Sequence, residues 1–213
     1  MKSGTRALGV AESYPGTARV PSDDSTETTF STDSTQRSAD RLDSPPESVL
    51  CGAVVRADRV VDGLEFETCT VGGDDATDAI ASLYHGLGRD DVRYVLVSGI
   101  APAWFNIVDI DRLATTLDRP VLSVSFEASD GLETALSEQF SGEALARRLD
   151  SYRAAPPRRE LDVNGERLFV RAAGCDDDEA TRVIRAFTPT GGRPEPLRVA
   201  RMAARAARRF VGN

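Results

Sequence analysis

Arginines follow one face of the C-terminal segment, and their spacing suits contacts with phosphate. Residues 193 to 213 include six arginines and a single glutamate, Glu195, although the 213-residue chain carries a formal net charge of −8. Four of these arginines recur at steps of three and four, which places them on one side of a predicted helix: Arg198, Arg201, Arg205 and Arg208. Guanidinium groups match the oxygens of phosphate well. Together with Arg193, this face predicts binding of a nucleic-acid backbone; the alternative is pairing with acids of the protein itself or of another subunit.

Other common site chemistries lack the residues that they need. His85 is the only histidine, and the three cysteines show no CxxC spacing, which argues against a zinc site, a Ser-His-Asp triad and a disulfide framework. The glycine pairs at 72–73 and 191–192 lack the further glycines and the lysine of nucleotide-binding loops. The chain also contains no run of the roughly 18 apolar residues that a membrane span needs. We therefore expect a cytoplasmic protein.

The acidity of the chain indicates an adaptation to salt. There are 34 acids against 26 bases, and Lys2 is the only lysine. This composition is typical of a protein from a high-salt cytoplasm, where acidic residues keep the surface hydrated and salt screens their repulsion. The net charge therefore describes solubility and does not exclude a nucleic acid as partner.

Hydrophobic periodicity predicts alternating strands and helices in a single α/β domain over residues 1–213. The expected strands are 7–10, 49–61, 64–71, 92–97, 121–126, 160–163 and 167–172, with hairpin turns at Asp62-Gly63 and Asn164-Gly165. The expected helices are 76–87, 105–117, 132–152 with a break at Ser141-Gly142, 176–187 and 193–211. Segment 21–48, rich in Ser, Thr, Asp and Glu, is predicted to be a disordered insertion.

The order strand, hairpin, helix, strand, helix, strand is that of the ribonuclease H-like fold, a mixed sheet of three antiparallel strands plus parallel strands flanked by helices. Four segments carry a more specific resemblance: GVAES at 9–13, GGDDATDAI at 72–80, SGIAPAWFNIVD at 98–109 and GGRPEPLRVAR at 191–201. They resemble the archaeal endonuclease dU family, which is related in fold to endonuclease V. The resemblance implies a metal-dependent DNA endonuclease of DNA repair that cuts near deoxyuridine.

A metal centre is part of what the resemblance implies, with Mg²⁺ as the expected ion and Mn²⁺ as an alternative. Its ligands would be Glu12 on the first strand, Asp78 in the first helix and Asp109 after the fourth strand. Glu12 follows Ala11, the position at which an endonuclease V-like pattern places an aspartate, so Glu12 suits the role only if the strand has ended there. At the end of the fourth strand, Ser98 stands where an aspartate is expected. The number of metal ions in the predicted site, one or two, is therefore left open.

Four further residues complete the predicted site. Asp75, Ser98 and Asn106 would shape it, although Asp75 with Asp78 can equally serve as helix cap and capping box. Trp104, the only tryptophan, would test an extruded base; the alternative is that it fills the core.

These observations leave three functions open. The first is the Mg²⁺-dependent endonuclease acting on DNA with deaminated bases. The second is a nucleic-acid-binding protein that has the nuclease fold but no catalysis, which Ser98 favours. The third is an endonuclease V-like nuclease acting on RNA at inosine.

Overall fold

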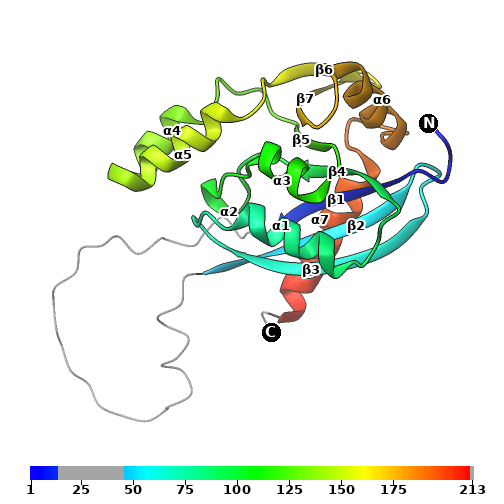
Figure 1. The fold of residues 1–213 in the computed structure, drawn as a ribbon, viewed down its shortest axis with the longest axis horizontal. Coiled ribbons are helices and arrows are strands. Elements are labelled where there is room, and N and C mark those ends of the chain that lie inside the picture. Colours follow the sequence, from blue (N-terminus) through cyan, green and yellow to red (C-terminus); the bar gives the residue numbers. More distant parts are fainter. Residues whose placement is uncertain (14–45, 212–213) are drawn as a thin grey trace, which may run out of the picture.

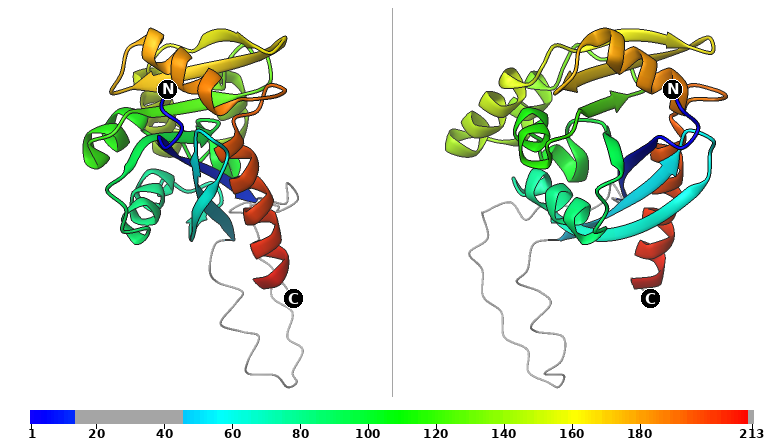
Figure 2. Two further views of the ribbon diagram at one scale, coloured as in Figure 1. Left: turned by 90° about the vertical axis from the view of Figure 1, so that its right-hand side faces the viewer. Right: turned by 45° about the vertical axis from the view of Figure 1, so that its right-hand side comes forward.

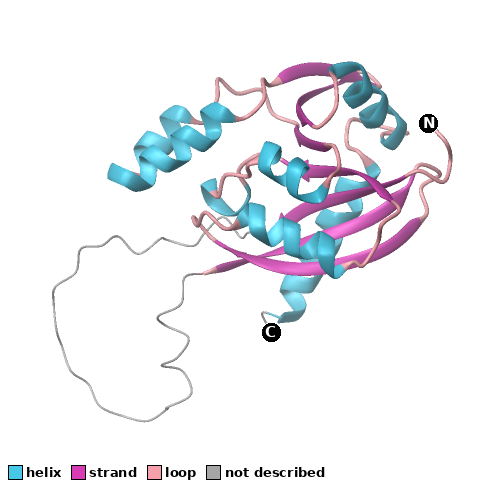
Figure 3. Cartoon of the chain, in the orientation of Figure 1, coloured by secondary structure: helices cyan, strands magenta, loops and turns pink. Residues whose placement is uncertain are grey.

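The computed structural model describes residues 1–13 and 46–211, which form a seven-stranded mixed sheet with helices on both faces (Figures 1 and 3). The strands are β1 (Arg6–Ser13), β2 (Glu47–Arg56), β3 (Val61–Thr70), β4 (Val92–Ser98), β5 (Val121–Ser125), β6 (Arg159–Val163) and β7 (Glu166–Ala173). The helices are α1 (Ala76–Gly86), α2 (Pro102–Phe105), α3 (Ile110–Leu117), α4 (Glu133–Gln139), α5 (Gly142–Ala154), α6 (Asp177–Phe187) and α7 (Glu195–Val211). The predicted mixed α/β fold is confirmed.

The strand order is β3-β2-β1-β4-β5-β7-β6. The first three strands are antiparallel, β1, β4 and β5 run parallel, and the β6–β7 hairpin pairs antiparallel to β5. The carboxyl ends of β1, β4 and β5 therefore meet at one edge of the sheet. Ligands of open α/β sheets bind at such an edge.

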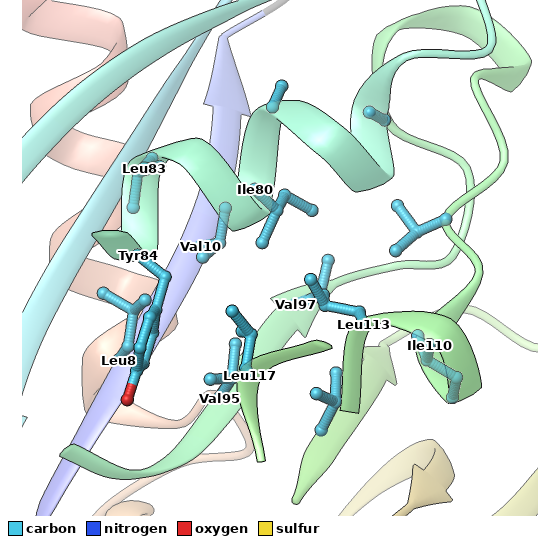
Figure 4. Packing of buried hydrophobic residues seen from close by; sticks show 14 of the residues in the cluster. Leu8, Val10, Ile80, Leu83, Tyr84, Val95, Val97, Ile110, Leu113 and Leu117 are labelled. Carbon is cyan, nitrogen blue, oxygen red and sulfur yellow. The ribbon is translucent and has the colours of Figure 1, made fainter. Parts of the chain in front are cut away.

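Alternating side chains of the central strands build a core on each face of the sheet. On β1, Leu8 and Val10 pack with Ile80 and Leu83 of α1 and with α3 (Figure 4). Ala11, the residue after Val10, packs with α7 on the other face. Figure 2 shows α7 on one side of the sheet and α1 and α3 on the other. No helix of the described residues is long and apolar enough to cross a membrane.

Helix α7 comes very close to β1 at Gly9. A Cβ atom on Gly9 would overlap the backbone of Pro196 and would lie 2.6 Å from the backbone nitrogen of Leu197. Only glycine allows this approach, after which Leu197, Ala200 and Ala204 of α7 are fully buried. The close contact therefore sets the path of the arginine-bearing helix across the sheet.

Three of the predicted elements need correction. The β2–β3 turn lies at residues 57–60, with Arg59 at φ 74°, instead of at Asp62-Gly63. The helix expected over 105–117 begins only at Ile110 as α3, capped by Asp109, and the short helix α2 precedes it at residues 102–105. Most of the expected insertion 21–48 lies outside the described residues, but Glu47 and Ser48 belong to β2, where a neighbouring strand supplies the pairing that local polarity does not reveal.

We expect Gly9→Ala to lower the free energy of unfolding by about 1–3 kcal/mol, because the added methyl group must displace the first turn of α7. Denaturant titration of the two proteins measures this difference. Gly4→Ala is the matched control, since a Cβ atom on Gly4 meets nothing within 4 Å. Equal stability of the two variants would contradict the proposed close approach.

Candidate functional site

A small polar pocket lies where the carboxyl ends of β1 and β4 meet α7. Its volume is about 150 Å³, and it is lined by Ala11, Glu12, Ser13, Ser98, Arg201 and Arg205. Two strands provide one carboxylate and two hydroxyl groups, and the helix provides two guanidinium groups. We call this the arginine pocket.

Arg193, which precedes α7, adds a third guanidinium group near the arginine pocket. Burial lowers the pKa of Arg193, and the nearby charges of Arg201 and Arg205 lower it further. Its guanidinium carbon lies 3.7 Å from the centre of the Phe126 ring, and its buried Nη1 finds no hydrogen-bond partner in residues 1–13 and 46–211. Within the same residues, none of the three arginines forms an ion pair with a carboxylate. Such a group of cations is suited to an anion.

The other predicted arginines of α7 lie elsewhere. Arg198 pairs with Glu195, with 2.5 Å between Nη2 and Oε1. Arg208 is half-buried in the last turns and does not line the pocket. The buried side of α7 ends before its last residue, since Val211 is 76% exposed. The pairing of Arg198 with an acid of its own helix is the alternative that the spacing left open.

Glu12 borders the arginine pocket from within a regular strand. β1 continues to Ser13 without a shift in its pairing with β2, so the condition that the strand ends at Glu12 is not met. Glu12 consequently shares the side of Leu8 and Val10, whereas Ala11 faces α7. The hydroxyl group of Ser48 donates a hydrogen bond of 2.7 Å to Glu12 Oε2.

Asp78 and Asp109 do not line the pocket with Glu12. The side chain of Asp78 is 69% exposed and pairs with Arg112, with 2.7 Å between Oδ1 and Nη1. Asp109 Oδ1 accepts a hydrogen bond of 2.9 Å from the backbone nitrogen of Arg112 and thereby caps α3. In the described part of the chain, no three His, Cys, Asp or Glu side chains come close enough together to hold a metal ion. The trio predicted from the resemblance is therefore not assembled.

Asp75 and Asn106 form a structural network that connects β3, α1 and the α2–α3 loop. Asn106 is fully buried and donates to Asp75 Oδ1 at 2.6 Å, while its Oδ1 accepts from the backbone nitrogen of Ala76. Asp75 also accepts hydrogen bonds from the backbone nitrogen and the hydroxyl group of Thr70. The side chain that caps α1 is thus Asn106, and the expected capping box of Asp75 and Asp78 does not form. Burial alone would raise the pKa of Asp75, but the hydrogen bonds from Thr70 and Asn106 hold it below its ordinary value.

Trp104 lies in an unusual left-handed turn and packs in an aromatic cluster. Ala103, Trp104 and Phe105 all have positive φ angles, between 47° and 62°, a conformation that costs about 1–2 kcal/mol per residue outside glycine. The Trp104 ring contacts Phe105 and Phe140, with 5.1 Å between its centroid and that of Phe140. The half-exposed Trp104 is therefore held beside α4 and does not line the arginine pocket.

Sequence reasoning missed several residues that organise this region. Arg148 stacks over Phe140 at 4.0 Å and donates hydrogen bonds to the carbonyl groups of Gly72 and Gly73, which ties α5 to the loop before α1. Ser48 and Phe126 contact site residues from distant parts of the chain. The sequence analysis included Phe126 only as the last residue of the strand expected over 121–126, and β5 ends one residue before it.

The donor set of the arginine pocket does not fit a resident Mg²⁺ centre. Mg²⁺ in proteins prefers carboxylate oxygens, usually with waters and substrate phosphates. Here Glu12 is the single carboxylate, the other donors are serine hydroxyl groups, and two guanidinium groups repel a cation. The arrangement can bind a phosphate group directly.

Comparisons with solved structures identify the class of fold to which this protein belongs. A crystal structure of a protein of unknown function from Archaeoglobus fulgidus matches with a TM-score of 0.72 at 23% identity, over 95% of this chain and 97% of the other. Endonuclease V from Ciona intestinalis, solved with DNA containing an inosine followed by a ribo-adenosine, matches with a TM-score of 0.56 at 12% identity, over 97% of this chain and 87% of the other. The fold is that of the endonuclease V nucleases.

The family follows from sequence comparison. The model of the family "Endonuclease dU" matches residues 3–208. A UPF0215 protein of Pyrobaculum aerophilum is 33% identical over 166 residues, which cover 77% of this chain and 88% of the relative. The chain belongs to the endonuclease dU family, and the resemblance stated from its four segments is confirmed.

We expect Asp75→Asn to lower the free energy of unfolding by about 1–2 kcal/mol at neutral pH, because the carboxylate that accepts three hydrogen bonds is removed. The pKa of Asp75 is lowered in the folded state, so its contribution is complete above the ordinary carboxyl pKa and disappears as the pH falls through the folded value. Denaturant titrations of both proteins at about pH 7 and about pH 3 measure this decrease. A difference that stays constant with pH would contradict the assignment.

Proposed function

We propose that this chain is an endonuclease that acts on DNA containing deaminated bases such as deoxyuridine and binds the DNA backbone in the arginine pocket. The family and the fold are those of nucleases. The observation that carries the proposal is that Arg201 and Arg205 meet at the carboxyl ends of β1 and β4, with Arg193 close enough to sense their charges.

The charge distribution supports a phosphate as the bound group. Phosphate contacts supply most of the sequence-independent affinity of DNA-binding proteins. The whole chain is acidic, with a net charge of −8, yet these three arginines have no acid partner in the described residues. A local cluster of cations in an acidic surface attracts an anion to one place and not to the surface as a whole.

Glu12 is the residue proposed to take part in bond cleavage. Glu12 lines the arginine pocket from the face of Leu8 and Val10, whereas Arg201 and Arg205 enter it from the face of α7. At the end of the strand, the carboxylate would accept the proton of an attacking water, and the guanidinium groups would stabilise the charge that develops on the phosphoryl oxygens. Ser48 donates to Oε2 of Glu12, and no described residue donates a hydrogen bond to its Oε1. The dependence on Mg²⁺ or Mn²⁺ that the resemblance implies stays a prediction.

Binding without cutting is the second candidate function. It is favoured by Ser98 at the end of β4 and by the lack of a carboxylate trio in the described residues. Under this alternative, the chain uses the arginine pocket to bind DNA or RNA, and Glu12 is a structural partner of Ser48.

A nicking assay separates these functions. Duplexes with uracil or inosine, and RNA with inosine, are incubated with the full chain at high salt in Mg²⁺, in Mn²⁺ or in EDTA. We expect nicking of the uracil duplex, and we expect Glu12→Gln to lower its rate at least about 100-fold while binding persists. Glu143→Gln, on an exposed side chain of α5, is the matched control. Binding without nicking under every condition would favour the second candidate, and the absence of both would overturn the proposal.

We expect Arg201→Gln and Arg205→Gln each to weaken DNA binding about tenfold, because each removes charge-assisted hydrogen bonds to phosphate. The slope of log K against log salt concentration should become smaller by about 0.9 for each phosphate that the variant no longer neutralises. Fluorescence anisotropy with a labelled duplex at several salt concentrations measures both quantities. Arg198→Gln removes the same charge from the same helix at a residue that is paired with Glu195, so a similar weakening in this variant would contradict a specific arginine pocket.

A further inference from the structure

A second pocket lies on the other face of the sheet, between the strands β5 and β7 and the helices α4 and α5. Its volume is about 270 Å³. It is lined by Gly99, Ile100, Ala101, Ser123, Ser125, Glu127, Ser129, Leu132, Tyr152, Arg158, Phe169 and Arg171. Its wall at residues 99–101 directly follows Ser98 of the arginine pocket, so the two pockets open near the same sheet edge.

Strand alternation gives this pocket its polar floor. On β5 and β7, Leu122, Val124, Leu168 and Val170 pack into the core beneath α6. The intervening residues point to the opposite face, where Ser123 pairs across the strands with Arg171 and Ser125 with Phe169. The floor thus combines hydroxyl groups, an aromatic ring and a guanidinium group.

Two arginines enter the pocket without acid partners. The guanidinium carbon of Arg158 lies 3.9 Å from the centre of the Phe169 ring, and the group donates to Ser125 Oγ at 3.2 Å and to the Ser129 carbonyl at 2.9 Å. Arg171 lies over Tyr152 and donates to the carbonyl group of Pro156. Across the residues that the structure describes, neither arginine forms an ion pair.

In the described residues, the two arginines are surrounded by neutral acceptors instead of carboxylates, and Arg158 also donates to the carbonyl group of Glu127. Glu127 is the one acid that lines the pocket, and it lies on the exposed rim. Burial lowers the pKa of Arg158, and the charge of Arg171 also lowers it. Two like charges held close together without a carboxylate between them attract an anion.

The rest of the pocket suits a flat ring. Ile100 and Leu132 provide apolar walls, while the hydroxyl groups of Ser123 and Tyr152 provide polar contacts. Small-molecule sites typically combine such apolar walls with a few polar groups. The pocket can therefore hold a planar heterocycle joined to an anionic group.

We propose that this pocket binds a nucleoside monophosphate unit, with its phosphate on Arg158 and Arg171 and its base against Ile100 and Leu132. The choice of a nucleotide among anions of this shape rests on the proposed function. The unit comes either from a free mononucleotide or from a nucleotide of a bound strand, and both present the same chemistry to the pocket.

Calorimetric titration of the full chain with deoxyuridine monophosphate tests this proposal. We expect a single site, and at least tenfold weaker binding of deoxyuridine and of inorganic phosphate, since each lacks half of the interacting groups. Arg171→Gln should weaken nucleotide binding at least tenfold. Arg167→Gln, on the same strand but paired with Glu160, is the matched control and should bind like the unaltered chain.

Thermal melting shows whether Arg171→Gln folds. A second variant tests the proposal if it does not. Ser129→Trp places a bulky side chain at the exposed rim and should block the nucleotide without affecting the core. Displacement of the mononucleotide by a uracil-containing single strand would identify a strand as the source, and lack of displacement would identify the free nucleotide. Absence of nucleotide binding, or unchanged binding in both variants, would overturn the proposal. Because this assay contains no DNA duplex and no cutting step, its failure is distinguishable from failure of the endonuclease function.

Discussion

The contact between α7 and β1 at Gly9 is the constraint on which the candidate site depends. Because Gly9 has no side chain, the backbone at Pro196 and Leu197 lies directly on the strand. Ala200 then meets Ala11 one turn later. This path carries Arg201 and Arg205 over the carboxyl ends of β1 and β4. A helix that was displaced by a larger residue at position 9 would take its guanidinium groups away from Glu12.

Guanidinium groups stacked on aromatic rings recur around the carboxyl edge of the sheet. Arg193 lies over Phe126, and Arg158 lies over Phe169. Each ring replaces part of the solvent around a cation. Arg193 Nη1 has no hydrogen-bond partner among the described residues, whereas Arg158 donates to Ser125, Ser129 and Glu127. Arg112, by contrast, has its charge satisfied by Asp78. An acidic protein can thus concentrate its available positive charge in a few places.

The family indicates which class of enzyme this protein belongs to, and the residues that line the arginine pocket indicate which group it can bind. The endonuclease dU family and the endonuclease V-like fold place the chain among nucleases. The edge at which a sheet of this kind binds ligands is rich in guanidinium and hydroxyl groups, with Glu12 as its carboxylate. Under the proposed function, these cations hold a phosphate group, and Glu12 is the single acid of the pocket that can take part in the chemistry.

Local patterns in the sequence determined much of the fold and part of the site. Strand and helix periodicity, the Asn164-Gly165 turn and the spacing of Arg201 and Arg205 act over a few residues, so they can be recognised without a partner. Tertiary packing decided the rest. Asp78 pairs with a residue 34 positions away, and Arg193 lies near Arg201 and Arg205 because α7 crosses β1. Whether an acid meets a cation or a metal depends on how helices pack across the sheet, and no local pattern encodes that distance.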